Sequence, residues 1–251
     1  FHFLCWVVCA LMDGVTVLQD VDAEQLVEHF CLPKEAESLR EWIGKTKPRP
    51  TGFAEREGLA LDRRREGNEF FRKGDWDKAV WFYLAALHSV DYSKKDAILD
   101  GLDESVEKQR SLQEARATTL SNMAAAFGAK DDNYNAIRAA DLGLLFAEKL
   151  KRPGHWHEAL RSKLLSRRAV AKSRRGDDPR DALADIQKAV NLDQGKDHAM
   201  QATLRRLKAN AKASEPAFST MKGKLSTTTT TTTASAAAAA LGEEKAEERA
   251  L

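Results

Sequence analysis

The chain has few of the residues on which disulfide frameworks and metal sites depend. Its 251 residues include three cysteines, Cys5, Cys9 and Cys31, all in the first segment. An odd number without a CxxC spacing argues against a disulfide framework or a zinc site and fits a reducing compartment. His155 and His157 are two positions apart, which does not place both on one helix face. We therefore expect no metal and no cofactor.

A net charge of either sign is also lacking. Forty lysines and arginines stand against 38 aspartates and glutamates, which leaves +2. This balance does not favour nucleic acid as a partner. The charge is nevertheless uneven, because the segment 161–175 is basic without a single acid and the segment 243–251 is mainly acidic. Nucleic-acid binding through 161–175 stays a distant alternative, since no aromatic residues are interleaved there.

No apolar run is long enough to cross a bilayer. The opening stretch FHFLCWVVCALM falls short of the roughly 20 residues that a membrane helix needs, and it lacks a basic leader. Because the chain starts at Phe1 rather than at a methionine, two interpretations stay open. The stretch is the remnant of a longer anchor or signal, or it is translated upstream sequence and Met12 is the true start. We expect no membrane partner and a cytoplasmic location.

Recognisable catalytic motifs are absent from the sequence as well. It contains no nucleophile elbow, no glycine-rich nucleotide fingerprint and no paired carboxylates in an apolar context. The five tryptophans have spacings typical of core or turn packing rather than of a base-stacking platform. We therefore expect that the chain is not an enzyme.

What the chain does have is an internal repeat of helical hairpins. In the stretch REGNEFFRKGDWDKAVWFYLAAL, Gly67 and Ala79 are small enough to let two helices approach closely. Phe70 and Tyr83 are predicted to fill the layer between those helices. The segment 74–77 between them has the composition of a turn.

Two further copies of this pattern follow along the chain. TLSNMAAAFGAKDDNYNAIRAADLGL repeats the offsets around a turn at 131–133, and KLLSRRAVAKSRRGDDPRDALADIQKAVNLD does so with one extra turn residue. In the first turn Gly74 permits a positive φ and Asp75 can cap the next helix. Lys172 replaces the usual aromatic residue in the third copy. The segment 196–212 predicts an amphipathic capping helix, since the last hairpin otherwise exposes its apolar face.

These residues and spacings resemble the tetratricopeptide repeat family over roughly residues 60–212. The resemblance implies an all-α fold, a right-handed superhelical array of three helix-turn-helix repeats plus a C-terminal capping helix. The predicted order is an N-terminal segment with short helices and a linker (1–52), a repeat domain (53–212) and a low-complexity tail, expected to be disordered (213–251). The repeats and the capping helix are predicted near 60–93, 117–150, 162–195 and 196–212.

Two finer expectations concern the flanks of the repeats. In the N-terminal segment, the short helices are predicted at 23–30 and 34–43, followed by a linker at 45–52. The extra charged residues after Ser93 predict that the second helix of repeat one and the first helix of repeat two are both lengthened. Similar lengthening occurs in immunophilin-type co-chaperones, which this chain therefore resembles more than it resembles a bare three-repeat protein.

Five polar residues occupy repeat-defined positions on the predicted first helices. Arg64 and Asn68 are four apart and share one helix face, as do Lys163 and Arg167, and Asn122 lies on the equivalent helix of repeat two. In RREGN, LSN and KLLSR they match the family members that bind the C-terminal Glu-Glu-Val-Asp of heat-shock chaperones, with Arg64 replacing the commoner lysine. The resemblance implies a carboxylate clamp in a groove.

The chemistry of these residue types suits the end of a peptide. Lys163 and Arg64 can make charge-assisted hydrogen bonds to the two carboxylates of a terminal aspartate, each worth about 1.5–3 kcal/mol. Asn68 and Asn122 offer amide donors without adding repulsion among the cations. Arg167 can address an upstream carboxylate or a backbone carbonyl group.

Two further expectations complete the site. Phe71 and Ala125, on the same helices, are predicted to line a small apolar pocket for the penultimate valine. The remaining arginines of these helices are expected to be solubility or rim charges: Arg63, Arg65, Arg168 and Arg174. The alternative for all of these residues is a polar helix face that is merely solvated.

The sequence thus predicts a peptide-binding adaptor or co-chaperone that docks the C-terminal tail of heat-shock protein 90 or 70 class chaperones. It does not distinguish the two classes and does not determine the oligomeric state. Two other functions stay open: the repeat half of an immunophilin-like peptidyl-prolyl isomerase whose catalytic domain precedes Phe1, and an organelle-surface receptor for chaperone-bound preproteins.

Overall fold

The structure is a computed structural model. It describes residue 30 and residues 33–46, 49–92, 94–102, 105–149 and 155–213. Within these ranges the regular elements are helices, without a strand, and the all-α prediction is confirmed. The helices are α3 (Pro33–Thr46), α4 (Phe53–Arg72), α5 (Trp76–Ser89), α6 (Lys94–Leu99), α7 (Val106–Ala129), α8 (Asn133–Lys149), α9 (His155–Arg175) and α10 (Pro179–Leu192).

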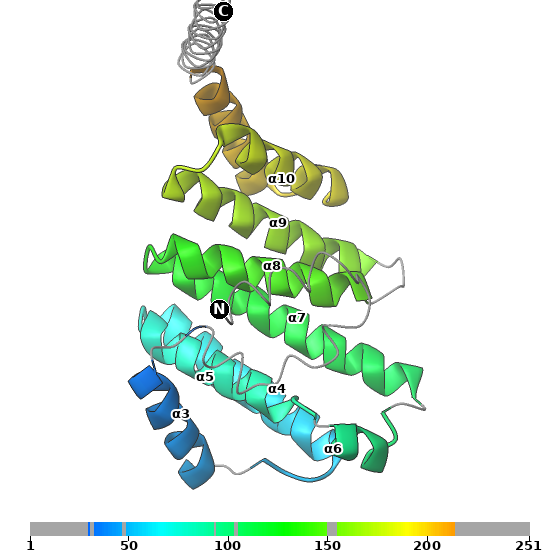
Figure 1. Cartoon of the computed structure of the whole chain (residues 1–251). Coiled ribbons are helices and arrows are strands. Elements are labelled where there is room, and N and C mark those ends of the chain that lie inside the picture. The colour runs from blue at the N-terminus through cyan, green and yellow to red at the C-terminus, as the bar shows by residue number, and fades with distance from the viewer. Residues whose placement is uncertain are drawn as a thin grey trace, which may run out of the picture. The chain divides into compact units, whose positions relative to one another are not determined.

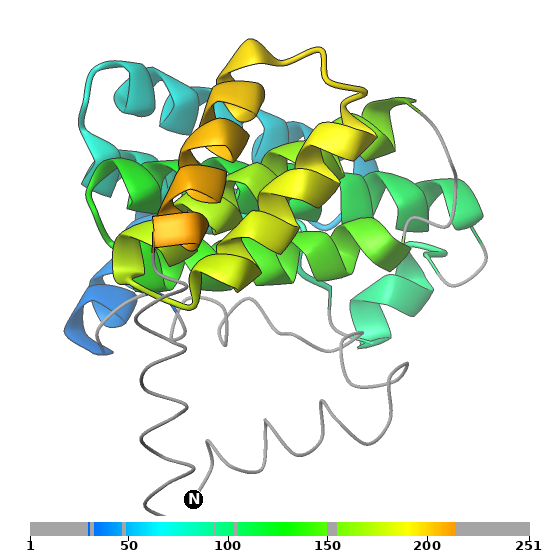
Figure 2. The ribbon, with the colours of Figure 1, turned by 90° about the horizontal axis from the view of Figure 1, so that it is seen from above.

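The chain divides into two compact units, Phe1–Leu204 and Arg205–Leu251. In the first unit, three helical hairpins, α4–α5, α7–α8 and α9–α10, stack in chain order (Figure 1). Figure 2 looks along this stack and shows the later hairpins lying over the earlier ones. A further helix begins at residue 198. Of the second unit the structure describes residues 205–213, which are helical.

Close approach within the first hairpin depends on Gly67, as the repeat pattern predicts. A Cβ atom at this position would lie 2.6 Å from Cε1 of Tyr83, which is less than any relaxed contact. Ala79 is completely buried on the facing helix. Glycine and alanine therefore let the Tyr83 ring fill the space between α4 and α5.

The predicted turn chemistry of the first hairpin is confirmed. Gly74 has a φ of +80°, a conformation that glycine adopts without strain. The Asp75 carboxylate accepts a hydrogen bond from the backbone N–H of Lys78 at 3.2 Å and so caps the start of α5. The third hairpin uses the same device, since Asp178 accepts from the N–H of Arg180 at 2.9 Å.

Between the first two hairpins, one prediction of lengthening is confirmed and the other is wrong. The first helix of the second hairpin, α7, does extend far towards its N-terminus and begins at Val106. The second helix of the first hairpin does not extend, because α5 ends at Ser89 and α6 forms separately. The carbonyl oxygens of His88 and Val90, which a continuing helix would use, accept hydrogen bonds from arginine side chains instead.

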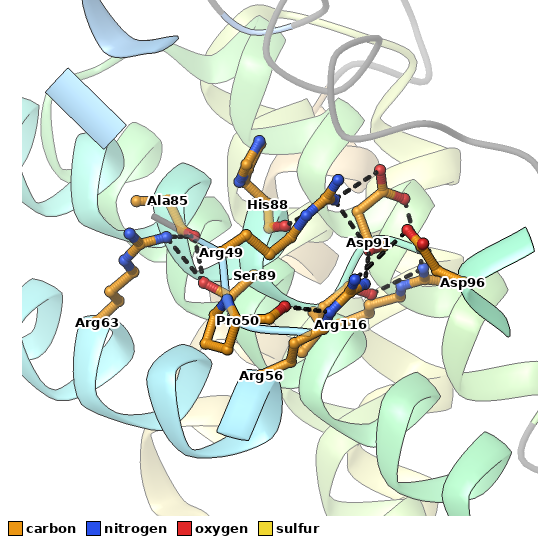
Figure 3. A network of polar contacts seen from close by, with 11 residues as sticks. Arg49, Pro50, Arg56, Arg63, Ala85, His88, Ser89, Asp91, Asp96 and Arg116 are labelled. Carbon is orange, nitrogen blue, oxygen red and sulfur yellow. Dashed lines mark hydrogen bonds and ion pairs between the residues drawn. The ribbon is translucent and has the colours of Figure 1, made fainter. Parts of the chain in front are cut away.

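Four arginines surround this end of α5 and are called the arginine cap below: Arg49, Arg56, Arg63 and Arg116 (Figure 3). They come from the chain before α4, from α4 and from α7. The carbonyl oxygen of Asp91 accepts from Arg49 at 3.0 Å and from Arg56 at 3.1 Å. Cations at a helix C-terminus also complement the helix dipole.

Arg63 belongs to this cap, and its prediction as a solubility or rim charge is wrong. Its side chain is 2% exposed and donates to the carbonyl oxygen of Ala85 at 2.8 Å and to the Ser89 hydroxyl at 2.9 Å. Burial lowers the pKa of Arg63, and the nearby Glu66 opposes this effect. Buried guanidinium groups of this kind hold α4 and α5 together rather than face a ligand.

Helix α3, before the repeats, packs against the first hairpin. The helix predicted at 34–43 is confirmed by α3, whose Trp42 meets the Phe82 ring edge-on at 5.2 Å between centroids. The helix predicted at 23–30 lies outside the described residues except for Phe30, which is helical and stacks on Phe127 at 5.6 Å. The opening apolar stretch and the tail from residue 214 on also lie outside them. None of the described helices combines the length and apolar character that crossing a bilayer requires.

Candidate functional site

The first helices of the three hairpins, α4, α7 and α9, are held in a regular register. Four side-chain contacts define it: Glu57 with Ser111, Asn68 with Asn122, Ser121 with Arg167, and Gly128 with Arg174. Both contacts between α4 and α7 join residues 54 positions apart, and both contacts between α7 and α9 join residues 46 positions apart. Equal offsets at separate levels mean that neighbouring first helices run in the same direction without slipping.

This register brings three of the five predicted clamp residues, Asn68, Asn122 and Arg167, to one level of the stack. Asn122 donates from Nδ2 to Oδ1 of Asn68 at 3.0 Å, and Arg167 donates to Ser121, the neighbour of Asn122. Arg64 and Lys163 each precede a partner on their own helix by four residues, about one turn or 5.4 Å. We call the five residues the clamp face. Their role in binding stays a prediction.

The two asparagines of the clamp face share a hydrogen-bond network with a buried tyrosine. Oδ1 of Asn68 accepts from Nδ2 of Asn122 and also from the Tyr83 hydroxyl at 2.8 Å. Tyr83 is 1% exposed, whereas both asparagines are half-buried. The arrangement ties α4 to both α5 and α7 at the level of the clamp face.

The cations of the clamp face have no carboxylate partner at ion-pair distance within the described residues. Arg167 donates from Nη1 to the carbonyl oxygen and the hydroxyl of Ser121, which are neutral acceptors. Burial lowers the pKa of Arg167 and, together with the neighbouring Arg65, that of Arg64; the more distant Glu114 opposes the shift at Arg64. Lys163 is exposed.

Other cations of α9 are engaged in ion pairs, so the basic segment 161–175 holds two kinds of cation. Arg168 binds the Asp185 carboxylate through two hydrogen bonds of 2.8 and 2.6 Å, and Lys172 donates to the same carboxylate at 2.8 Å. Arg168 also pairs with Asp141 at 2.6 Å. The prediction of Arg168 as a rim charge is therefore wrong. Lys172 stands where the repeat pattern has an aromatic residue and joins α9 to α10 by charge instead.

The two other arginines that the sequence assigned to the surface are indeed exposed. Arg174 donates to the carbonyl oxygen of Gly128 at 2.7 Å and lies 3.5 Å from Asp131. Arg65 lies 3.6 Å from Asp62 on the same helix. Pairs of this kind are weakened by solvent and contribute little to stability.

Phe71 and Ala125 are related by the same 54-position offset as the two asparagines, so they lie at one level, about one turn further along α4 and α7. Both are half-buried. Their place beside the clamp face is compatible with an apolar subsite, and the predicted role of this pair stays a prediction.

Two residues that hold the clamp face escaped the sequence prediction. Tyr83 was assigned to packing alone, and Ser121 was not singled out. Ser121 could have been found from its place directly before Asn122 in LSN, because the residue beside a clamp asparagine faces the next helix of the array. In the described part of the chain, no three His, Cys, Asp or Glu side chains gather as ligands for a metal ion.

Comparisons with known proteins give a likeness among solved structures. No family model matches the sequence, and no curated protein sequence matches it. Among solved structures, the chain is similar to the first tetratricopeptide repeat (TPR) domain of the human RPAP3 protein, determined by NMR. The two are 20% identical, with a TM-score of 0.42, and the match covers 63% of this chain and 95% of that one. A likeness at this TM-score says nothing about what either chain binds.

Proposed function

We propose that this chain is a cytoplasmic adaptor or co-chaperone of tetratricopeptide type, a binding module rather than an enzyme. Its ligand is the acidic C-terminal tail, Glu-Glu-Val-Asp, of heat-shock protein 90 or 70 class chaperones. One observation carries the proposal: Asn68 bonds Asn122, Arg167 bonds the residue beside Asn122, and no cation of the clamp face has a carboxylate partner at ion-pair distance among the described residues.

The electrostatics of the clamp face favour an incoming anion. Burial lowers the pKa of Arg64 and of Arg167 because removal from water destabilises the charged guanidinium form. A carboxylate that binds beside them relieves this cost. The folded chain has thus already partly desolvated these two arginines, so the peptide carboxylates meet preorganised donors.

The terminal aspartate of such a peptide matches the donors in number and kind. Its two carboxylates can pair with Lys163 and Arg64 while the amide nitrogen of Asn68 donates to a remaining oxygen. Arg167, fixed by Ser121 on one side, can bind an upstream glutamate through its other nitrogens. The adjacent Phe71 and Ala125 offer apolar contact to the penultimate valine.

The test is a calorimetric titration of the full chain with a peptide ending in Met-Glu-Glu-Val-Asp, beside its C-terminally amidated form. We expect micromolar affinity for the free acid, about −8 kcal/mol, weakening as salt is raised, and much weaker binding of the amide. Equal binding of the two forms, or no binding of either, would overturn the proposal.

A further inference from the structure

We infer that Tyr83 is a positioning residue for peptide binding, whose hydroxyl orients the Asn68 amide so that its nitrogen, and not its oxygen, faces the ligand. The inference rests on the proposed function and deepens it. It assigns a binding role to a residue that the repeat pattern explains by packing alone.

The position of Tyr83 is fixed independently of any ligand. Its ring is 1% exposed and lies against Gly67, where a Cβ atom would come within 2.6 Å of Cε1. From this site, the hydroxyl reaches Oδ1 of Asn68 at 2.8 Å. A phenol held on all sides by close packing cannot follow a moving amide, so the amide must adapt to it.

The acceptor capacity of Asn68 is then exhausted. An amide oxygen has two lone pairs, and here one accepts from Tyr83 and the other from Nδ2 of Asn122. A flipped Asn68 would instead bring its NH2 group against the NH2 group of Asn122, and two donors would meet. With the Asn122 amide and the Tyr83 hydroxyl both donating, the network selects one orientation of Asn68, in which both of its amide N–H groups remain for other acceptors.

Burial keeps the phenol in its donating form. Burial raises the pKa of Tyr83 to about 12, although Arg167 and Arg64 both act to lower it. The hydroxyl is thus protonated throughout the physiological range and donates to Asn68. The same two arginines belong to the clamp face, so Tyr83 lies close to it.

Removal of the Tyr83 hydroxyl should weaken peptide binding and hardly change the stability of the fold. In Tyr83→Phe the ring still fills its place, but Asn68 loses one of the two donors that orient it. The amide oxygen can then turn towards the peptide carboxylates, which repel it. We expect the affinity for the free-acid peptide to fall about tenfold, the effect of one hydrogen bond to a charged group.

Tyr92→Phe, at a second tyrosine of the same repeat whose ring lies under Arg56, is the matched control. It should change affinity less than about twofold.

A double-mutant cycle separates orientation from packing. If Tyr83 acts through Asn68, Tyr83→Phe costs less than about twofold in an Asn68→Ala background. Asn68→Asp gives a second test, because its carboxylate still accepts from Tyr83 and Asn122 but donates nothing. It should keep thermal stability and lose peptide binding. Equal losses from Tyr83→Phe in both backgrounds, or full affinity in the single variant, would overturn the inference.

A measurement on the free chain keeps this inference distinct from the proposed function. The side-chain amide NMR signals of Asn68, identified by their disappearance in Asn68→Asp, should shift in Tyr83→Phe and stay in place in Tyr92→Phe. Unshifted signals reject the orienting role. If the wild-type chain binds no peptide, the proposed function fails while the NMR result still decides the role of Tyr83. If it binds and Tyr83→Phe binds equally well, only the inference fails.

Discussion

The arginine cap and the clamp face both contain arginines that are at least partly removed from water, but these arginines contact different kinds of acceptor. In the cap, guanidinium groups meet the last carbonyl oxygens of α5 and the carboxylate of Asp91. On the clamp face, Arg64 and Arg167 are also removed from water, but the acceptors beside Arg167 are a neutral carbonyl group and a hydroxyl. Arg63 and Arg64 are neighbours in the sequence, but Arg63 belongs to the cap and Arg64 to the clamp face.

The difference teaches that burial alone does not reveal the role of an arginine. A buried guanidinium with anionic partners has its charge compensated by the fold and resists removal. Arg63 also bonds neutral acceptors, but it is 2% exposed and out of reach of a ligand, whereas the half-buried Arg167 keeps a charge that an anionic ligand can neutralise. The cap should therefore matter to folding and the clamp face to binding, and variants of each can break or sharpen this contrast.

The largest effect is expected from Arg116→Ala in the cap. Arg116 is 7% exposed, donates to the carbonyl oxygen of Val90 at 2.9 Å and lies 3.7 Å from the Asp91 carboxylate. Its loss leaves these buried groups short of a partner and opens a cavity, so the free energy of unfolding should fall by about 3–5 kcal/mol. Urea denaturation measures this effect. Arg110→Ala, an exposed arginine of the same helix, should cost less than about 0.5 kcal/mol. A loss of stability below about 1 kcal/mol in Arg116→Ala would mean that the arginine cap matters no more to folding than surface arginines do.

The next effect in size is on binding. Lys163→Ala or Arg167→Ala should weaken binding of the free-acid peptide by about 2–4 kcal/mol, as for truncated charge pairs, while helicity stays intact. Titration of each variant beside Lys188→Ala measures this loss. Lys188 is an exposed lysine of α10 outside the clamp face and serves as the matched control. If Lys188→Ala weakens binding as much as Lys163→Ala does, the peptide is attracted by general charge rather than by a clamp.

The helical pairing could be predicted from the sequence because it depends on local spacing. Gly67 and Ala79 identified the first hairpin, and Arg64 and Asn68, four residues apart, both lie in α4 and so share one face of it. The contacts between helices come from the register of three separate hairpins, which no local pattern encodes. The hydrogen bond from Tyr83 to Asn68 and that from Arg167 to Ser121 therefore appear only in the structure.

The burial of Arg63 could have been predicted from the sequence. It lies three residues after Ala60 and four before Gly67, both on the buried stripe of α4. The prediction followed the charge of Arg63 and not its place in the helical period. An arginine on an apolar helix stripe is, however, a candidate for capping carbonyl oxygens. The end of α5 was missed for a related reason, because its carbonyl oxygens are satisfied by arginines from other segments.

The smallest of these effects is expected from Asp185→Asn. This variant compares ion-paired cations and clamp cations within the single helix α9. Arg168 and Lys172 share α9 with the clamp cations, but both bind the Asp185 carboxylate, which is 4% exposed. Losing these charged hydrogen bonds should lower the free energy of unfolding at neutral pH by about 1–3 kcal/mol, with unchanged peptide affinity. A weakened affinity would show that the ion pairs also shape the clamp face.

The pH dependence of stability separates this ion pair from simple packing. Burial alone would raise the pKa of Asp185, but the hydrogen bonds and charges of Arg168 and Lys172 outweigh it and lower the pKa below the usual value. A carboxyl group with a depressed pKa stabilises the fold above its unfolded-state pKa of about 3.9, and this contribution is lost as the pH falls through the folded-state value. The wild-type chain should therefore lose its advantage over Asp185→Asn as urea denaturation is repeated from pH 6 down towards pH 3. A difference that stays constant over that range would mean that Asp185 acts by shape rather than by charge.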